Sequence, residues 1–171
     1  MTVARRISSL ADAPWLPAGS SAEAWVGSSC LVADPVIVVR LLITRETQAG
    51  DLEFFCALTP RGINIPTQYL WTDHREESFE AGRARLLDDV VGRHDFETPC
   101  IGYIRNVVPI PDQSYVYPVP WAHVPVLLLA HIAAPQIDGE WHTLATGRPA
   151  MSRQHWWPIV EHFLLTHGEQ P

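Results

Sequence analysis

The clearest helix signal in the sequence lies between Ser78 and Gly92, and strand-like runs flank it on both sides. Ser78 is a favourable N-cap, Glu80 places an acid in the first turn, and Gly92 is a natural C-terminal stop. Apolar residues recur between these limits at helical spacing, at Phe79, Leu86, Leu87, Val90 and Val91. Because one apolar face of a helix must be buried against another layer, this segment predicts a sheet beside it.

The runs around this helix have the composition of strands. The stretch 36–44 is rich in β-branched residues and long enough for a central strand, and a turn containing Gly50 leads to its antiparallel partner. A last helix is predicted from an N-cap at Ser152 to His167. Strands are predicted over residues 36–44, 52–58, 99–108, 124–133 and 140–144. The order predicts an α/β protein with a mixed sheet and helices on its faces.

The first 28 residues lack clean periodicity and are rich in Ala, Ser, Pro and Gly. We expect an irregular N-terminal arm over 1–28, with one short element around 22–26, that packs on the rest through Trp15 and Trp25. The length of 171 residues fits one domain, which we place at 29–171.

Composition excludes several classes of partner. The net charge is −7 and all twelve cations are Arg, so binding to a nucleic acid polymer is not expected. No apolar run approaches the roughly 20 residues of a membrane helix, and no secretory signal is evident, so we expect a cytoplasmic protein without a membrane partner. Cys30, Cys56 and Cys100 are far apart and lack zinc-ligand spacing, and they are expected to be small, buried or half-buried apolar side chains.

The segment 71–93 carries a second pattern, in which Glu77 is followed at fixed spacing by Arg85, Asp89 and Gly92. This spacing resembles the Nudix box, and the resemblance extends over residues 30–165. It implies a Nudix-like α/β/α sandwich with a mixed β-sheet. It also implies hydrolysis of a nucleoside diphosphate linked to another group, by metal-assisted attack of water with Mg²⁺ or Mn²⁺. The catalytic candidates that it gives are Glu77, Arg85 and Asp89.

The box is degenerate at the positions that matter most for chemistry. Trp71 and Arg93 replace its opening Gly and its closing aliphatic residue, and Leu86 and Val90 replace two of its glutamates. In the family, these glutamates lie four residues apart on one helix face and hold a divalent cation. Such a cation needs oxygen ligands, which Leu and Val cannot supply. The sequence therefore predicts that ordinary catalysis is weak or absent.

A different metal site is an open alternative. If the helix register shifts by one residue, Asp88 and Asp89 become the acidic pair, although Arg85 then loses its match and the pair rotates by about 100°. Glu77, together with Glu76 and His74 in the preceding loop, could add ligands. The metal candidates are therefore Glu77, Asp88 and Asp89, while Arg85 and Asp89 also have the spacing of a surface ion pair.

Aromatic residues before the buried strand are the candidates for ligand binding: Tyr115, Tyr117, Trp121 and His123. Their rings could stack on a base or a sugar, or they could close the end of the sheet. The histidines show no His-x-x-x-His pair, and neither a Gly-x-Ser-x-Gly elbow nor a glycine-rich phosphate loop is present. Zinc-protease, serine-hydrolase and P-loop chemistry are therefore not expected.

Three hypotheses follow. The first is a Nudix hydrolase with weakened catalysis that acts on a small phosphorylated or nucleotide-like molecule. The second is a catalytically silent Nudix-fold module that binds such a molecule, or a partner protein, in the same cleft. The third is a structural homodimer formed by the N-terminal arm and the last helix, which exposure of Trp156 or Trp157 would support and burial of both would weaken.

Overall fold

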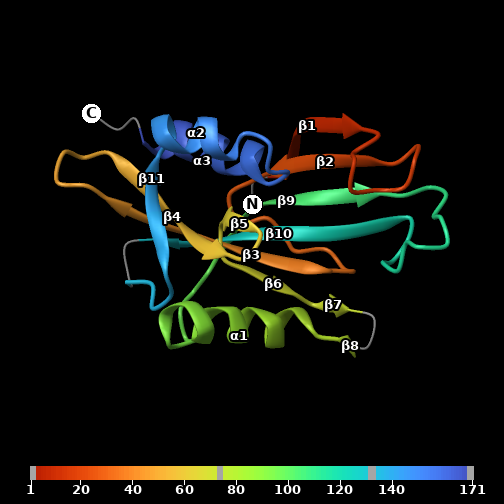
Figure 1. The fold of residues 1–171 in the computed structure, drawn as a ribbon, viewed down its shortest axis with the longest axis horizontal. Helices are drawn as coiled ribbons and strands as arrows, with labels where there is room; N and C mark the ends of the chain where they lie inside the picture. The colour runs from red at the N-terminus through yellow and green to blue at the C-terminus, as the bar shows by residue number, and fades with distance from the viewer. Residues whose placement is uncertain (1–2, 73–74, 131–133, 169–171) are drawn as a thin grey trace.

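A computed structural model describes residues 3–72, 75–130 and 134–168, and these form a mixed α/β structure (Figure 1). The main sheet has the strand order β1-β2-β9-β10-β3-β4-β11, with β6 on β3 and β5 on β4; β7 and β8 pair separately. Strands β10 and β3 run parallel, whereas the other pairs are antiparallel, so the sheet is mixed. The strands are β1 (Arg5–Ala11), β2 (Ser21–Val26), β3 (Val38–Glu46), β4 (Leu52–Thr59), β5 (Gly62–Asn64), β6 (Thr67–Tyr69), β7 (Trp71–Thr72), β8 (Arg75–Glu76), β9 (Cys100–Val107), β10 (Trp121–Ala130) and β11 (Gly139–Thr143).

Helices cover both faces of this sheet. In Figure 1, α1 (Phe79–Val91) lies below it, and α2 (Leu144–Met151) and α3 (Trp157–His167) lie above it. The alternation along β3 sends Val39 and Leu41 into the cluster under α1, and Val38 and Leu42 into the cluster under α3. The three layers confirm the α/β/α sandwich expected from the sequence.

The helix predicted between Ser78 and Gly92 is confirmed at both ends. The Ser78 hydroxyl accepts a hydrogen bond from the Ala81 amide at 3.2 Å, and Gly92 closes the helix in the left-handed region at φ 77°. Gly82 faces Leu70, and a Cβ at Gly82 would lie 1.9 Å from Leu70 Cδ2. This close approach seats α1 directly against the segment that follows β6.

The N-terminal segment is more regular than expected. The short element predicted at 22–26 is β2, which pairs with β9 and so joins the main sheet. The prediction of an irregular arm is wrong for Arg5–Ala11, because these residues form β1, which pairs with β2 at the edge of the sheet. This strand was missed because nearly all its residues are exposed, so no alternation of apolar and polar residues marks it.

The C-terminal helix begins later than predicted. Ser152 is the C-cap of α2, a short helix that the sequence did not reveal and that Thr143 caps at its start. The final helix starts at Trp157 instead. Trp156 and Trp157 are 0% and 3% exposed, which removes the surface indoles that a dimer through this helix would need. The end of the strand predicted over 124–133 lies outside the described residues.

The expectation that the cysteines are simple apolar side chains is wrong for two of them. Cys30 and Cys100 form a disulfide, with their Cα atoms 5.3 Å apart. The segment after β2 runs beside the start of β9, and the Cys30 amide donates to the Cys100 carbonyl at 3.1 Å. Cys56 is free and buried, as expected, and burial raises the pKa of its thiol to about 12. Among the described helices, none is long and apolar enough to cross a membrane.

Candidate functional site

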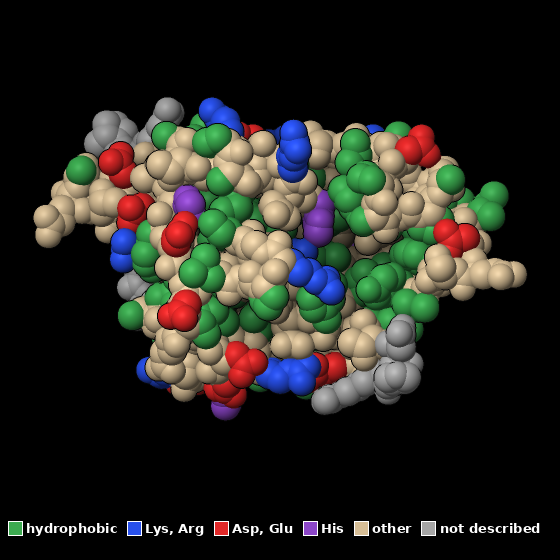
Figure 2. Space-filling view, in the orientation of Figure 1, with side chains coloured by type: hydrophobic (Ala, Val, Ile, Leu, Met, Phe, Trp, Pro, Cys, Tyr) green, Lys and Arg blue, Asp and Glu red, His purple; other side chains and the backbone are tan. Residues whose placement is uncertain are grey.

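A cavity of about 530 Å³ opens between α1 and the turns that join β4, β5 and β6. We call it the α1 cavity. Its volume is within the range of small-molecule sites. On the face that Figure 2 presents, hydrophobic side chains gather across the middle of the molecule. The cavity is lined by residues 57–61, 64–69, Leu86, Asp89, Val90 and Ile137.

Helix α1 presents a mainly apolar wall to this cavity. Leu86 and Val90 are each 3% exposed and belong to the core cluster that packs α1 on the sheet. Asp89 lies between them in sequence, is exposed, and is the one carboxylate among the residues that line the cavity. The positions at which the Nudix box carries a metal-binding pair are therefore part of the hydrophobic core.

Asp88 does not join Asp89 as an acidic pair. The Asp88 carboxylate lies 2.8 Å from Nδ1 of His94, on the exposed side beyond the end of α1. Asp88 is not among the residues that line the α1 cavity. The alternative helix register, in which the two aspartates act together, therefore has no support in the geometry.

Glu77 and Arg85 form an ion pair, in which Nη2 of Arg85 donates to Oε2 of Glu77. The Glu77 side chain is only 7% exposed, and its amide donates to the Leu70 carbonyl at 2.8 Å. The pair therefore fixes the loop before α1 to the helix. The alternative ion pair between Arg85 and Asp89 is not formed.

The described residues do not fit a box-type metal site. Glu77 is engaged by Arg85, Asp88 by His94, and Asp89 lines the α1 cavity without a second carboxylate. Within 3–72, 75–130 and 134–168, no group of three or more His, Cys, Asp or Glu side chains is placed to hold a metal ion. His74, another candidate from the sequence, lies outside the described residues.

Sequence reasoning missed Arg40, a buried cation in β3 that is 3% exposed. Its Nη1 donates to Oγ1 of Thr67 at 2.6 Å and to Oδ1 of Asn64 at 3.2 Å. Its Nη2 lies 2.9 Å from Nε2 of His155, whereas its Nε has no partner. The structure records no carboxylate within ion-pair distance of Arg40 in the part of the chain that it describes.

The protonation states of this cluster follow from burial. Burial lowers the pKa of Arg40 to about 10, so the guanidinium remains charged at neutral pH. Burial, followed by the charge of Arg40, lowers the pKa of His155 to about 3. A neutral His155 can then accept the hydrogen bond from Arg40 through Nε2.

The buried charge of Arg40 lies directly behind the wall of the α1 cavity. Its partners Asn64 and Thr67 both line that cavity. Asn64 is fixed from a second side, because Nε1 of Trp156 donates to its Oδ1 at 2.8 Å. A cation in a wall of low dielectric constant favours an anionic group in the space beyond. An Arg inside the apolar run 36–44 was the sequence signal for this cluster.

The aromatic candidates lie elsewhere and do not converge. Tyr115 and Tyr117 contact each other edge to face, with their ring centres 5.5 Å apart. Trp121 is half exposed, and the Arg105 guanidinium lies 5.7 Å from its ring. His123 is buried, and burial lowers its pKa. None of these four residues lines the α1 cavity.

Neither a family model nor a curated protein matches this sequence, but solved structures match its fold. A mutant form of the pyrophosphohydrolase BsRppH of Bacillus subtilis is 10% identical with a TM-score of 0.51, over 95% of this chain and 98% of that chain. The Nudix domain of Shewanella oneidensis NrtR, complexed with ADP ribose, is 14% identical with a TM-score of 0.50, over 79% and 90%. The chain has the Nudix fold.

Helix α1 carries Arg85 and Asp89, two residues of the predicted box, and we call it the box helix. The fold is the one that the resemblance in the spacing of Glu77, Arg85 and Asp89 implied. An Ap4A hydrolase of Caenorhabditis elegans is also similar, at 14% identity and a TM-score of 0.49, over 77% of this chain and 98% of that chain. At such identities, the likeness concerns the fold.

Proposed function

We propose that this chain is a Nudix-superfamily protein that binds a small phosphorylated or nucleotide-like molecule in the α1 cavity without the usual metal-dependent hydrolysis. The observation that carries the proposal is the burial of Leu86 and Val90, which form an apolar wall where a Mg²⁺ or Mn²⁺ site would need carboxylates. Asp89 alone cannot supply that ligand set. The hydrolase expected from the resemblance is therefore the runner-up.

The polar side chains around the α1 cavity support an anionic ligand. Arg61 is exposed at its edge, where its guanidinium can donate two hydrogen bonds to a phosphate group. The buried charge of Arg40 reinforces the attraction through the wall. The Asp89 carboxylate is unfavourable beside a phosphate, so it is better suited to accept hydrogen bonds from a sugar hydroxyl or an amino group.

A base also has suitable contacts in this cavity. Tyr69 is 47% exposed and offers an aromatic face, while Leu58, half exposed, offers an apolar one. Gln68 and Asn64 carry amide groups that donate and accept hydrogen bonds. A few polar groups among apolar walls are typical of a small-molecule site.

The test compares binding with turnover in the same samples. ADP-ribose, diadenosine tetraphosphate and ADP are each added to the protein with Mg²⁺ or Mn²⁺, while the melting temperature and product formation are measured. We expect at least one of these to raise the melting temperature, because a ligand that binds only the native state stabilises it, with no product formed. Arg61→Gln should reduce the shift, whereas Arg93→Gln, which lies outside the cavity, should not.

Three outcomes would reject this proposal. Metal-dependent product formation that disappears in Asp89→Ala would establish the hydrolase instead. Stabilisation that Arg61→Gln leaves unchanged would place the ligand elsewhere, and the absence of any shift with the three nucleotides would favour a partner protein as the occupant of the cleft.

Location and assembly are further parts of the proposal. A cytoplasmic location remains a prediction, and the Cys30–Cys100 disulfide weighs against it, because such bonds are rare in that compartment. A homodimer also remains a prediction, and it would have to use a surface other than the buried indoles of Trp156 and Trp157.

A further inference from the structure

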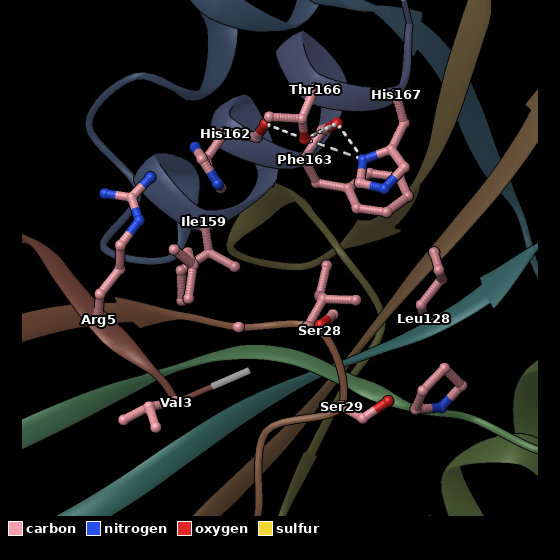
Figure 3. Close-up of a pocket in the computed structure, with 14 residues that line it drawn as sticks. Val3, Arg5, Ser28, Ser29, Leu128, Ile159, His162, Phe163, Thr166 and His167 are labelled. Atoms are coloured by element: carbon pink, nitrogen blue, oxygen red, sulfur yellow. Dashed lines mark hydrogen bonds between the residues drawn. The ribbon is translucent and has the colours of Figure 1, made fainter. Parts of the chain in front are cut away.

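A second pocket, of about 430 Å³, lies on the opposite side of the sheet from α1 (Figure 3). We call it the α3 pocket. It is bounded by the last turns of α3, the start of β1, and the segments beside the Cys30–Cys100 disulfide. Its apolar lining comes mainly from Val26, Ile101, Leu128, Ile159 and Phe163, which belong to the core cluster under α3 or pack against it.

Basic side chains stand around this apolar lining. Figure 3 shows Arg5 and His162 on one side of the pocket and His167 on the other. The lining residues, all of them within the described ranges, include no Asp or Glu. The neighbouring Arg6 is different, since its Nη1 donates to Glu23 at 2.9 Å. Arg5 has no such ion pair with a described carboxylate.

His167 is held in a fixed orientation. Its ring stacks on Phe163 with the ring centres 4.3 Å apart, and its Nδ1 lies 3.0 Å from the Phe163 carbonyl. Because the Phe163 carbonyl can only accept a hydrogen bond, Nδ1 of His167 carries the hydrogen. The other ring nitrogen, Nε2, does not take part in this bond.

The basic groups also repel one another. The pKa of His162 is held below its ordinary value, first by burial and then by the charges of Arg5 and His167. An anion beside Arg5 and His162 would offset this repulsion and would favour the protonated form of His162. The pocket thus combines an apolar interior with a local excess of positive charge in a protein whose net charge is −7.

We infer that the α3 pocket binds a small molecule with an apolar body and a single carboxylate, a ligand class separate from that of the α1 cavity. The apolar body packs against Ile101, Leu128 and Ile159, and the carboxylate accepts hydrogen bonds from Arg5 and from the protonated imidazole of His162, which lie on the same side of the pocket. The charged and titratable residues that line the pocket are Arg5 of β1 and His162 and His167 of α3. Binding therefore strengthens as the pH falls and His162 becomes protonated.

Three probes of equal chain length test this inference by isothermal titration calorimetry on the full chain: octanoate, octan-1-ol and octylammonium. We expect octanoate to bind about tenfold more tightly than octan-1-ol, and octylammonium to bind more weakly than both. Arg5→Gln should weaken octanoate about tenfold and leave octan-1-ol unchanged, whereas Arg6→Gln should change neither. Octanoate should also bind more tightly at pH 6 than at pH 8, and this difference should be smaller in His162→Gln.

Other outcomes would overturn the inference. The absence of octanoate binding would show that the α3 pocket is not a binding site for this ligand class. Equal affinities for octanoate and octan-1-ol would show that the basic groups do not contribute to binding. Ile101→Trp, which fills the pocket, should abolish the binding of both probes; if it melts like the wild type and still binds octanoate, the ligand lies elsewhere. Arg61→Gln should leave octanoate binding intact, which separates this site from the α1 cavity.

Discussion

Leu86 and Val90 lie one helical turn apart on α1, and both are buried between the helix and the sheet at the wall of the α1 cavity. Carboxylates at these two positions would present oxygen ligands to a cation in the cavity. The apolar pair instead stabilises the packing of the box helix. The same helix face can serve as core or as metal site, and in this chain it is core.

The first prediction concerns the contribution of this packing to stability. Leu86→Ala should lower the free energy of unfolding by about 2–5 kcal/mol, because it removes a buried side chain and leaves a cavity. Asp89→Ala, next along the cavity wall but exposed, should change it by less than about 0.5 kcal/mol. Urea denaturation measures both. Equal effects of the two substitutions would contradict the assignment of Leu86 to the core.

A second prediction follows from the neutral His155. Unfolded His155 takes up a proton near pH 6.5, whereas folded His155 does so only near pH 3, so between these values the unfolded state binds more protons. The free energy of unfolding should therefore fall as the pH drops below 6.5, by up to about 1.4 kcal/mol for each pH unit. His155→Gln keeps an acceptor for Arg40 but cannot titrate, and its pH profile should be flatter. Identical profiles for the two proteins would refute this account.

The buried Arg40 gives a third prediction, which separates binding from stability. Arg40→Met removes the charge but keeps the apolar length of the side chain. Because the part-buried oxygens of Asn64 and Thr67 then lose a donor, the free energy of unfolding should fall by about 1–3 kcal/mol, while the cavity keeps its lining residues. The affinity for the anionic ligand of the α1 cavity should nevertheless fall on the order of tenfold, or about 1.4 kcal/mol. Calorimetric titration with the ligand found by the thermal-shift screen measures it. An unchanged affinity would mean that the charge behind Asn64 and Thr67 does not act on the ligand.

The disulfide gives a fourth prediction. Cys30 and Cys100 close a loop with a sequence separation of 70 residues, so their reduction should lower the free energy of unfolding by about 4 kcal/mol. Cys30→Ser/Cys100→Ser should match the reduced wild type. A thiol reagent should modify Cys56 alone when the oxidised protein is unfolded, and all three cysteines after reduction. Three reactive thiols in oxidised, unfolded protein would show that the bond is absent.

Local signals in the sequence were enough to place the box helix. Ser78 and Gly92 act through hydrogen bonds to residues a few positions away. Both ends of the helix could therefore be predicted without knowledge of the fold. The spacing of Glu77 and Arg85 likewise indicated the Nudix fold. By contrast, β1 carries almost no buried residue, and α2 is short, so neither had a periodic pattern to read.

The parts that escaped prediction depend on residues far apart in the sequence. Cys30 meets Cys100 only because β2 is inserted beside β9. Arg40 contacts His155 across 115 positions, and spacing along the chain does not reveal such contacts. For the same reason, the sequence did not predict the α3 pocket, because its lining residues come from distant segments that include β1 and α3.

The most direct test of the proposed loss of the metal site is a titration of the purified protein with Mn²⁺, followed by electron paramagnetic resonance of the free ion. We expect the signal of free Mn²⁺ to rise with added Mn²⁺ up to millimolar concentration as much as it rises in buffer without protein. This should hold for the wild type and for Asp89→Ala. Stoichiometric uptake of Mn²⁺ by the wild type that is lost in Asp89→Ala would contradict it, because a cation would then bind at the wall formed by Leu86 and Val90.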